Sequence, residues 1–163
     1  MLAYEEDIHV PLLVRGPGIQ PGTTIDLISA NIDIAPTIIE LAGAQTDAFV
    51  DGRSFAQFIS GPAQPTNTDW RKALLIETGS LERESPVIAY RGVRTENYIY
   101  IEYENGELEF YDLVVDPYQM DNIASQLSEK TLSILHTWLG ELKLCQAEEC
   151  RQIEMNIPAG IDY

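Results

Sequence analysis

Two strand-like runs joined by Asn105-Gly106 constrain the fold more than any other feature of this sequence. The run 98–103 is rich in β-branched and aromatic residues, and the run 107–111 alternates on the far side of the pair. An Asn-Gly pair supplies the two positive-φ positions of a type I′ turn. We therefore predict an antiparallel hairpin over residues 98–111 with a type I′ turn at its tip.

The segments on either side of this hairpin extend the same architecture. Residues 74–78 and 87–94 are strand-like, and Ser128 stands where it can cap a final helix. That helix carries one apolar stripe, formed by Leu132, Leu135, Leu139 and Leu142. The second part of the chain is expected to be a small antiparallel sheet covered by a C-terminal helix.

The first part of the chain has a different pattern, a strand followed by a helix. Residues 10–15 form a short apolar run that ends in a loop rich in glycine and proline, which predicts a buried strand. Asp33 as an acidic cap, Pro36 in the first turn and Gly43 at the end predict a helix. Its apolar residues on one face are Ile34, Ile38, Leu41 and Ala42. This pattern is typical of the edge of an α/β layer.

A change of pattern near residue 62 suggests where the chain divides. Residues 50–61 predict a turn and a short helix, and the polar segment 62–69 contains two prolines, which is typical of a linker. We therefore predict that residues 1–62 are the end of an α/β domain and that residues 63–163 form the sheet-and-helix subdomain.

The charge of the chain disfavours two classes of partner. Ten basic and 26 acidic side chains leave a formal net charge of -16, which repels nucleic acid and anionic membranes. No stretch approaches the roughly 20 apolar residues that a membrane span needs. With 45% hydrophobic residues the chain is expected to be globular, without a nucleic-acid partner or a membrane span.

The sequence contains two cysteines, Cys145 and Cys150, separated by four residues. In an oxidising compartment they can close a small disulfide loop, and in the cytosol they can remain as two thiols. A zinc site is disfavoured, because two thiolates without further ligands do not complete a tetrahedral shell and His136 is the only imidazole nearby.

A search for hydrolase chemistry finds little. The sequence has no Gly-x-Ser-x-Gly elbow, no Gly-rich phosphate loop and no His-Glu-x-x-His helix. His9, close to Asp7 and just before the predicted strand, is the one candidate for a proton donor or anion contact, with a surface or capping role as the alternative. His136 lies within the final helix and is interpreted as structural.

The other polar clusters favour structural roles. The three carboxylates of residues 5–7 cannot converge on a cation if the segment is extended, so no metal site is predicted there. Asp112 and Asp116 are expected to bond turn amides. Three arginines have the forked donors that bind sulfate or phosphate, but carboxylate partners are favoured in so acidic a chain: Arg15, Arg91 and Arg94.

Several stretches resemble the carboxy-terminal portion of sulfatases of the arylsulfatase and N-acetylglucosamine-6-sulfatase type. Tyr4-Glu-Glu-Asp-Ile-His-Val-Pro-Leu-Leu-Val-Arg-Gly-Pro-Gly18 resembles the stretch after their active-site lysine. The resemblance continues through the Asp-x-x-Pro-Thr helix at residues 33–37 and the Asp-Gly-x-Ser element at 51–55, and then through 90–95, 109–113, 116–117 and 122–124. It extends to about residue 151 and includes the cysteine pair found in secreted members of the family.

This resemblance implies the alkaline-phosphatase-like α/β fold, with the first part of the chain completing the large catalytic domain. It also implies a sulfuric ester hydrolase that uses calcium and a formylglycine made within Cys/Ser-x-Pro-x-Arg. The sequence lacks that motif, and the family's calcium ligands and active-site lysine would lie upstream of Met1. We therefore expect an incomplete sulfatase with no catalytic or metal-binding residues of its own. His9, where relatives often carry arginine, is its one expected substrate contact.

Three partners and settings follow from the resemblance as expectations. The protein partner would be the missing N-terminal part of a sulfatase. The substrate of the intact enzyme would be a sulfated sugar or an aryl sulfate. The intact enzyme would be secreted, periplasmic or lysosomal. Two alternatives stay open: a noncatalytic interaction module, or a fragment of a related phosphodiesterase or phosphonate hydrolase.

Overall fold

The computed structural model describes residues 2–60, 70–79 and 88–163, and these form two compact units. The first unit consists of residues 1–10 together with 72–163, and the second of residues 11–71. The predicted linker 62–69, and with it the predicted division after residue 62, lies outside the described residues. That division therefore stays a prediction.

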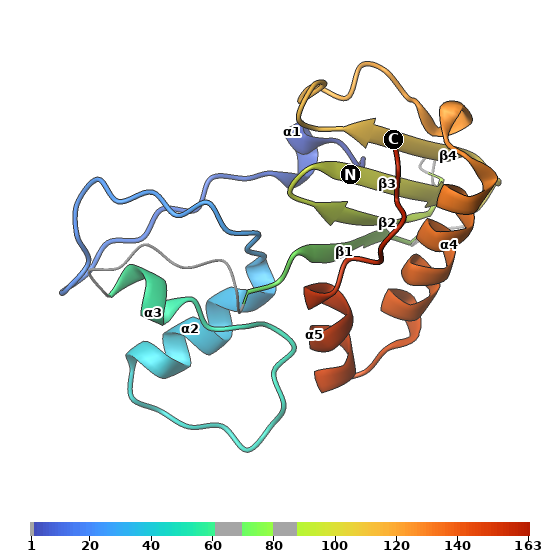
Figure 1. Ribbon diagram of the computed structural model, residues 1–163. Helices are drawn as coiled ribbons and strands as arrows, with labels where there is room; N and C mark the ends of the chain where they lie inside the picture. The colour runs from blue at the N-terminus through green and yellow to red at the C-terminus, as the bar shows by residue number, and fades with distance from the viewer. Residues whose placement is uncertain (1, 61–69, 80–87) are drawn as a thin grey trace. The chain divides into compact units, whose positions relative to one another are not determined.

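The first unit is built on a four-stranded antiparallel sheet in the order β1-β2-β3-β4 (Figure 1). Its strands are β1 (Ala73–Thr78), β2 (Tyr90–Thr95), β3 (Tyr98–Tyr103) and β4 (Leu108–Asp112). The helices of this unit are α1 (Glu5–Ile8), the 3₁₀ turn η2 (Ala124–Gln126), α4 (Glu129–Leu144) and α5 (Glu148–Met155). The predicted antiparallel sheet with a helix across it is confirmed.

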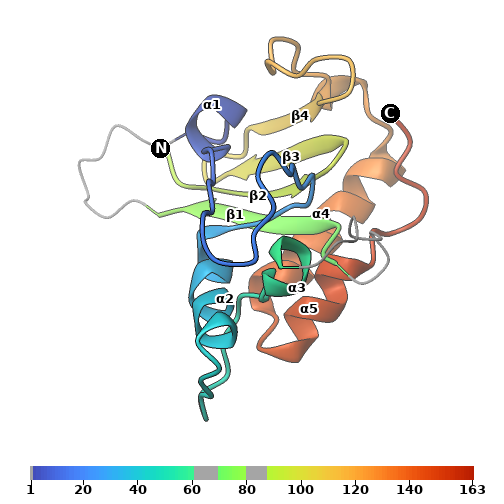
Figure 2. The ribbon, with the colours of Figure 1, turned by 90° about the vertical axis from the view of Figure 1, so that its left-hand side faces the viewer.

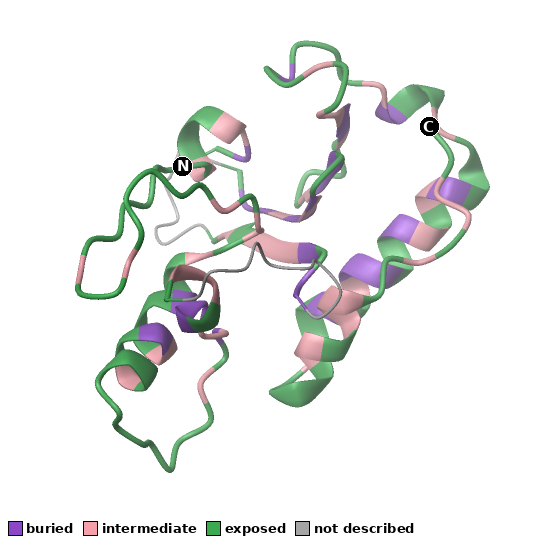
Figure 3. Ribbon diagram, turned by 60° about the vertical axis from the view of Figure 1, so that its left-hand side comes forward, coloured by how far each residue is buried: buried purple, intermediate pink, exposed green. Residues whose placement is uncertain are grey.

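The inner strand β3 is buried on both faces, because α4 and α5 lie along one face of the sheet and α1 lies on the other (Figures 2 and 3). Alternate residues therefore enter different cores. Tyr98 and Tyr100 pack with Phe110, Trp138 and the helical leucines. The opposite core is smaller and consists of Ala3, Tyr90, Ile99, Ile101 and Tyr111.

The long helix α4 has the start and the apolar stripe that its sequence predicts. The Ser128 hydroxyl accepts a hydrogen bond from the Thr131 amide at 3.1 Å, which caps the first turn. Leu135, Leu139 and Leu142 are buried, and Leu132 packs against the same core. Burying such a stripe contributes about 2 kcal/mol or more for each leucine.

The tip of the hairpin differs from the prediction. The Tyr103 amide donates to the Glu107 carbonyl at 2.9 Å and the Gly106 amide donates to the Tyr103 carbonyl at 3.0 Å, so the loop has three residues. Within it only Gly106 has a positive φ, 87°. The Asn105 side chain instead accepts from the Glu107 amide at 3.0 Å. The type I′ prediction is wrong, and the loop is a three-residue connection closed by a left-handed glycine.

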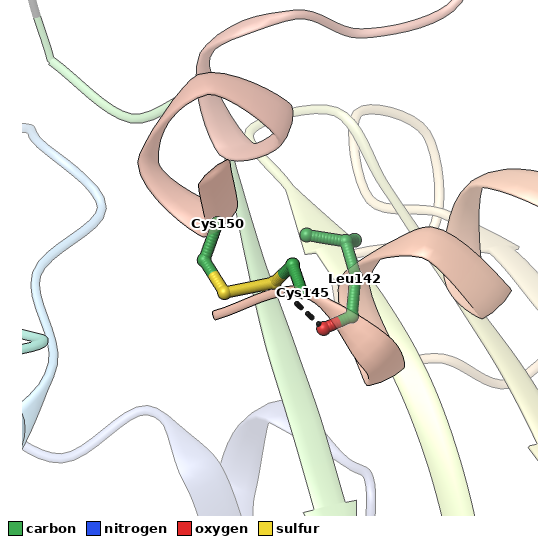
Figure 4. The surroundings of a disulfide bond; sticks show 3 residues. All are labelled: Leu142, Cys145 and Cys150. Atoms are coloured by element: carbon green, nitrogen blue, oxygen red, sulfur yellow. Dashed lines mark hydrogen bonds between the residues drawn. A yellow bond between two sulfur atoms is a disulfide. The ribbon is translucent and has the colours of Figure 1, made fainter. Parts of the chain in front are cut away.

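Cys145 and Cys150 form a disulfide between the end of α4 and the first turn of α5 (Figure 4). The Cys145 sulfur also lies 3.1 Å from the Leu142 carbonyl oxygen. This link holds α5 beside the sheet, where Ile153 packs on the main core and the Glu154 carbonyl accepts from the Lys72 amide at 2.9 Å. Closing so short a loop stabilises the fold by about 2 kcal/mol in the chain-entropy picture.

The second unit contains the 3₁₀ turn η1 (Asn31–Asp33), α2 (Ile34–Leu41) and α3 (Ala56–Ile59). The helix predicted from residue 33 to 43 is present over a shorter range, and Gly43 ends it with a φ of 63°. The short helix predicted within residues 50–61 is present as the single turn α3. Gly52 is required where it stands, because a Cβ there would collide with the Ile32 carbonyl group.

Asp33 does not cap α2 as predicted, because its carboxylate is buried and paired with Arg71. The two guanidinium nitrogens donate to the two carboxylate oxygens at 2.6 and 2.8 Å. The same oxygens accept from the amides of Ala30 at 2.8 Å and Arg53 at 2.7 Å. A buried carboxylate with four such donors is fully satisfied, and it holds three distant stretches of the unit together.

One other prediction for the first part of the chain, the buried strand, is wrong. Residues 10–15 form no strand, and Leu13 is 93% exposed. The apolar face of α2 is exposed as well, with Ile38 at 60% and Leu41 at 52%. A strand or an apolar helix face is stable only against a neighbouring layer, and no described residue of this unit provides one.

Candidate functional site

The most organised polar region of the chain is the N-terminal segment, which is docked on the sheet of the first unit. Ala3 is fully buried, and Tyr4 and Ile8 pack against the smaller core. The Tyr4 carbonyl accepts from the amides of Asp7 and Ile8, so the segment forms the short helix α1. The carboxylates of residues 5–7 therefore lie on a helix and not on an extended segment, which fits the preference of carboxylates for the first turn of a helix.

A buried glutamine holds this segment in place. Gln119 is 5% exposed, and its side-chain oxygen accepts from the Glu5 amide at 2.6 Å. Its side-chain nitrogen donates to the Ala3 carbonyl at 3.2 Å, and its backbone has a φ of 52°. Holding glutamine in this left-handed region costs on the order of 1 kcal/mol, so the two hydrogen bonds must offset that strain. No sequence pattern marks Gln119 itself, although the preceding Asp116-Pro117 pair marks the turn that carries it.

His9 stands at the end of α1 beside Glu5. Its Nδ1 lies 3.1 Å from a Glu5 carboxylate oxygen, while the imidazole side chain is 73% exposed. Arg94 of β2 donates two hydrogen bonds to the same carboxylate, from Nε at 3.1 Å and from Nη2 at 3.0 Å. The acidic partner is thus fixed by an arginine from the sheet, and the imidazole faces solvent, where it can contact an anion.

The other residues considered from the sequence do not join this group. His136 is exposed and its Nδ1 lies 2.8 Å from a Glu102 oxygen. Arg91 lies 3.4 Å from Glu77 on the neighbouring strand, and Arg15 is exposed in the second unit.

Asp112 and Asp116 bond turn amides, as predicted. Their carboxylates accept from the amides of Val114 and Asp121, both at 2.9 Å.

In the part of the chain that the structure describes, no group of three or more His, Cys, Asp or Glu side chains is placed to hold a metal ion. A hollow of about 360 Å³ in the second unit is lined by α2 and residues 44–50, and its charged groups are the carboxylates of Glu40 and Asp47. Such a lining repels an anionic ligand. No helix within residues 2–60, 70–79 and 88–163 has the length and apolar character for crossing a membrane.

Buried tyrosines make the first unit sensitive to high pH. Burial raises the pKa of Tyr98, Tyr100 and Tyr111 above the ordinary value of about 10, and a hydrogen bond to Glu102 adds to the shift at Tyr100. A raised folded-state pKa stabilises the fold below pH 10, and this contribution is lost as the pH rises further. Each such tyrosine then lowers the free energy of unfolding by about 1.4 kcal/mol per pH unit.

We therefore expect urea unfolding of the first unit, followed by Trp138 fluorescence, to shift to lower urea between about pH 10 and 12. Tyrosinate absorbance should appear together with unfolding. The variant Tyr100→Phe should show a shallower dependence on pH. A stability that stays constant over this range would contradict the prediction.

A family model described as "N-sulphoglucosamine sulphohydrolase, C-terminal" matches residues 1–144. The match ends with α4, so that α5 and both cysteines of the disulfide lie beyond it.

Among curated proteins the chain is similar to N-acetylglucosamine-6-sulfatase of Bos taurus, with 34% identity over 179 residues. That alignment covers 91% of this chain and 31% of the bovine protein. N-acetylglucosamine-6-O-sulfatase of Bacteroides thetaiotaomicron is 35% identical over 123 residues, which cover 74% of this chain and 22% of the relative. The chain therefore spans less than a third of the length of these relatives.

Solved structures are also similar to this chain, again over a part of their length. The structure of BT4656 in complex with its substrate D-glucosamine-2-N,6-O-disulfate superposes with a TM-score of 0.66 and 28% identity, over 83% of this chain and 27% of that one. A phosphonate monoester hydrolase from Silicibacter pomeroyi gives a TM-score of 0.61 with 23% identity, over 79% of this chain and 27% of that one, and shares the fold.

Proposed function

This chain belongs to the sulfatase family, as part of the C-terminal portion, and from that premise we propose that it supports a sulfuric ester hydrolase without hydrolysing sulfate esters by itself. The observation that carries the proposal is the lack of the formylglycine motif in the sequence. Both cysteines are joined in a disulfide, and no cysteine or serine of the chain begins a Cys/Ser-x-Pro-x-Arg motif.

The cofactors that the family implies do not fit the residues that the structure describes. Formylglycine needs the motif that the sequence lacks. Calcium needs several carboxylate oxygens that converge, whereas the carboxylates of Glu5 and Asp33 are paired with arginines and those of Asp112 and Asp116 bond backbone amides. In our proposal both groups are held by the catalytic portion of the enzyme.

The names of the relatives support an amino sugar with a sulfate ester as the substrate of the intact enzyme. Two curated relatives are named for N-acetylglucosamine 6-sulfate, and BT4656 was solved with a glucosamine disulfate as its substrate. We propose that His9 contacts this substrate at the mouth of the site, since its exposed imidazole is available to an anion. A secreted, periplasmic or lysosomal setting agrees with the disulfide.

The exposed apolar residues of the first part of the chain support a protein partner. Val10 is 70% exposed, and Leu12 and Leu13 are 50% and 93% exposed. Together with the exposed face of α2 they make more apolar surface than an isolated chain usually leaves in water. We propose that the catalytic portion of the same enzyme covers them, with residues 10–15 adding as a strand to its sheet.

A chimera tests the proposed function. The catalytic portion of the Bacteroides thetaiotaomicron relative is joined to this chain, which replaces the matching C-terminal residues of that enzyme. We expect the chimera to hydrolyse N-acetylglucosamine 6-sulfate, and we expect neither this chain alone nor the shortened relative alone to do so. Sulfate release by this chain alone, or a folded chimera without activity, would contradict the proposal.

The same experiment separates the alternatives. The only support for phosphonate hydrolysis is the shared fold. That alternative predicts that the chimera hydrolyses a phosphonate ester faster than a sulfate ester. A noncatalytic module would show cooperative unfolding and monodisperse behaviour of the chain alone, with an inactive chimera.

A further inference from the structure

The loop between β4 and η2 exposes an unusual number of large apolar side chains. We call residues 113–121 the apolar loop. Four of its side chains are mostly in water: Val114 at 68%, Val115 at 78%, Tyr118 at 71% and Met120 at 84%. A single exposed apolar residue is ordinary, but four within seven positions form a patch of the kind that marks binding surfaces.

This loop is held in one conformation by its own polar groups. The Asp116 amide donates to the Asp112 carbonyl at 2.8 Å, and the Gln119 amide donates to the Asp116 carbonyl at 3.1 Å. The two carboxylate contacts to the amides of Val114 and Asp121 close the remaining turns. A surface already ordered before binding loses little conformational entropy on contact, which favours association.

Gln119 connects the apolar loop to the start of the chain. Its side chain bonds the backbone of Ala3 and Glu5, which places the first residues directly beside the loop. The matched family model describes a C-terminal region. Because the alignment covers only 31% of the bovine relative, that relative is about three times as long as this chain. In such relatives the polypeptide that precedes this region therefore emerges next to the apolar loop.

We propose that the apolar loop is a docking surface for the catalytic portion of the sulfatase, namely for the part of the same polypeptide that leads into Ala3. The inference rests on the proposed function. The apolar loop itself contains the acidic residues Asp116 and Asp121, so the occupant carries an apolar centre with lysine or arginine at its rim. The net charge of -16 disfavours an anionic membrane as the occupant.

Oxidation of Met120 tests the proposal. Peroxide converts an accessible methionine to the sulfoxide, and Met155 on α5 is a half-buried internal control in the same unit. We expect the oxidation rate of Met120 to be about tenfold lower in the chimera than in this chain alone, with little change at Met155. Equal oxidation of Met120 in both proteins overturns the proposal, whether or not the chimera is active.

The outcome is distinguishable from that of the proposed function. An active chimera with an exposed Met120 contradicts only the docking surface, and an inactive chimera with a protected Met120 contradicts only the proposed function. Protection of Met120 in the isolated chain that increases with protein concentration would assign the loop to a second copy and overturn the proposal.

Charged variants provide a second measurement. Val115→Asp combined with Tyr118→Asp should leave the unfolding of the isolated chain unchanged, because both side chains are already in water. In the chimera the same pair should lower the melting temperature and increase Met120 oxidation. The matched control is Leu144→Asp, at a position 76% exposed at the end of α4, which should change neither protein. The proposal is contradicted if the pair of substitutions changes the melting temperature and the Met120 oxidation of the chimera no more than the control substitution does.

Discussion

Replacing Arg71 with methionine is expected to destabilise the unit of residues 11–71 by about 3–5 kcal/mol. The guanidinium is fully buried and meets Asp33 through two short hydrogen bonds. Removing it leaves the Asp33 carboxylate buried with only two backbone donors, from Ala30 and Arg53. The loss is comparable to the whole stability of a small domain, so we expect the unit to unfold.

Hydrogen exchange of the α2 amides measures this loss of stability. Trp70 fluorescence is not used as the probe, because the Trp70 ring lies 5.6 Å from the guanidinium carbon that the substitution removes. The control is Arg15→Met at an exposed arginine of the same unit, which should change stability by about 0.5 kcal/mol or less. Removing both charges with Asp33→Leu and Arg71→Met should recover part of the loss, because no unpaired charge stays buried. Unchanged exchange in Arg71→Met would show that the pair does not support this unit.

Truncating Phe110 to alanine is expected to cost the first unit about 3–5 kcal/mol. The ring is fully buried on β4, stacks on Tyr98 with 5.2 Å between centroids, and lies 5.0 Å from the Tyr163 ring. Its removal leaves a cavity between the sheet and the C-terminal residues, and the rigid strands on either side can collapse only partly into it.

Urea unfolding followed by Trp138, which is 2% exposed in the same core, measures the change. The control is Leu108→Ala on the same strand, where the side chain is 37% exposed and the expected loss is about 1 kcal/mol or less. Equal losses in the two variants would contradict the burial seen for Phe110.

The secondary structure of the first unit could be predicted because its signals are local. The period of the strand residues and the cap at Ser128 act between neighbours a few positions apart, and β3, β4 and α4 appear where those signals place them. The type of turn could not be predicted. An Asn-Gly pair permits both a two-residue type I′ turn and a three-residue loop, and the pairing of Tyr103 with Glu107 selects the three-residue loop.

The failures for the first part of the chain have one physical cause. The pattern of residues 10–15 describes a strand, but hydrogen bonding to a neighbour makes a strand, and the described residues of the unit offer no such neighbour. The same holds for the exposed face of α2. A pattern states what a segment can bury, and the surrounding chain decides whether it does so.

By itself, the sequence determined the family, the antiparallel sheet and the helix that covers it, because motif and period are properties of short stretches. The tertiary structure alone decided which polar groups meet. The bonds of Arg71 to Asp33, of Arg94 to Glu5 and of Gln119 to Glu5 span 38, 89 and 114 residues. At such separations no local preference selects the partner. The backbone path brings the groups together, and burial makes each pairing obligatory.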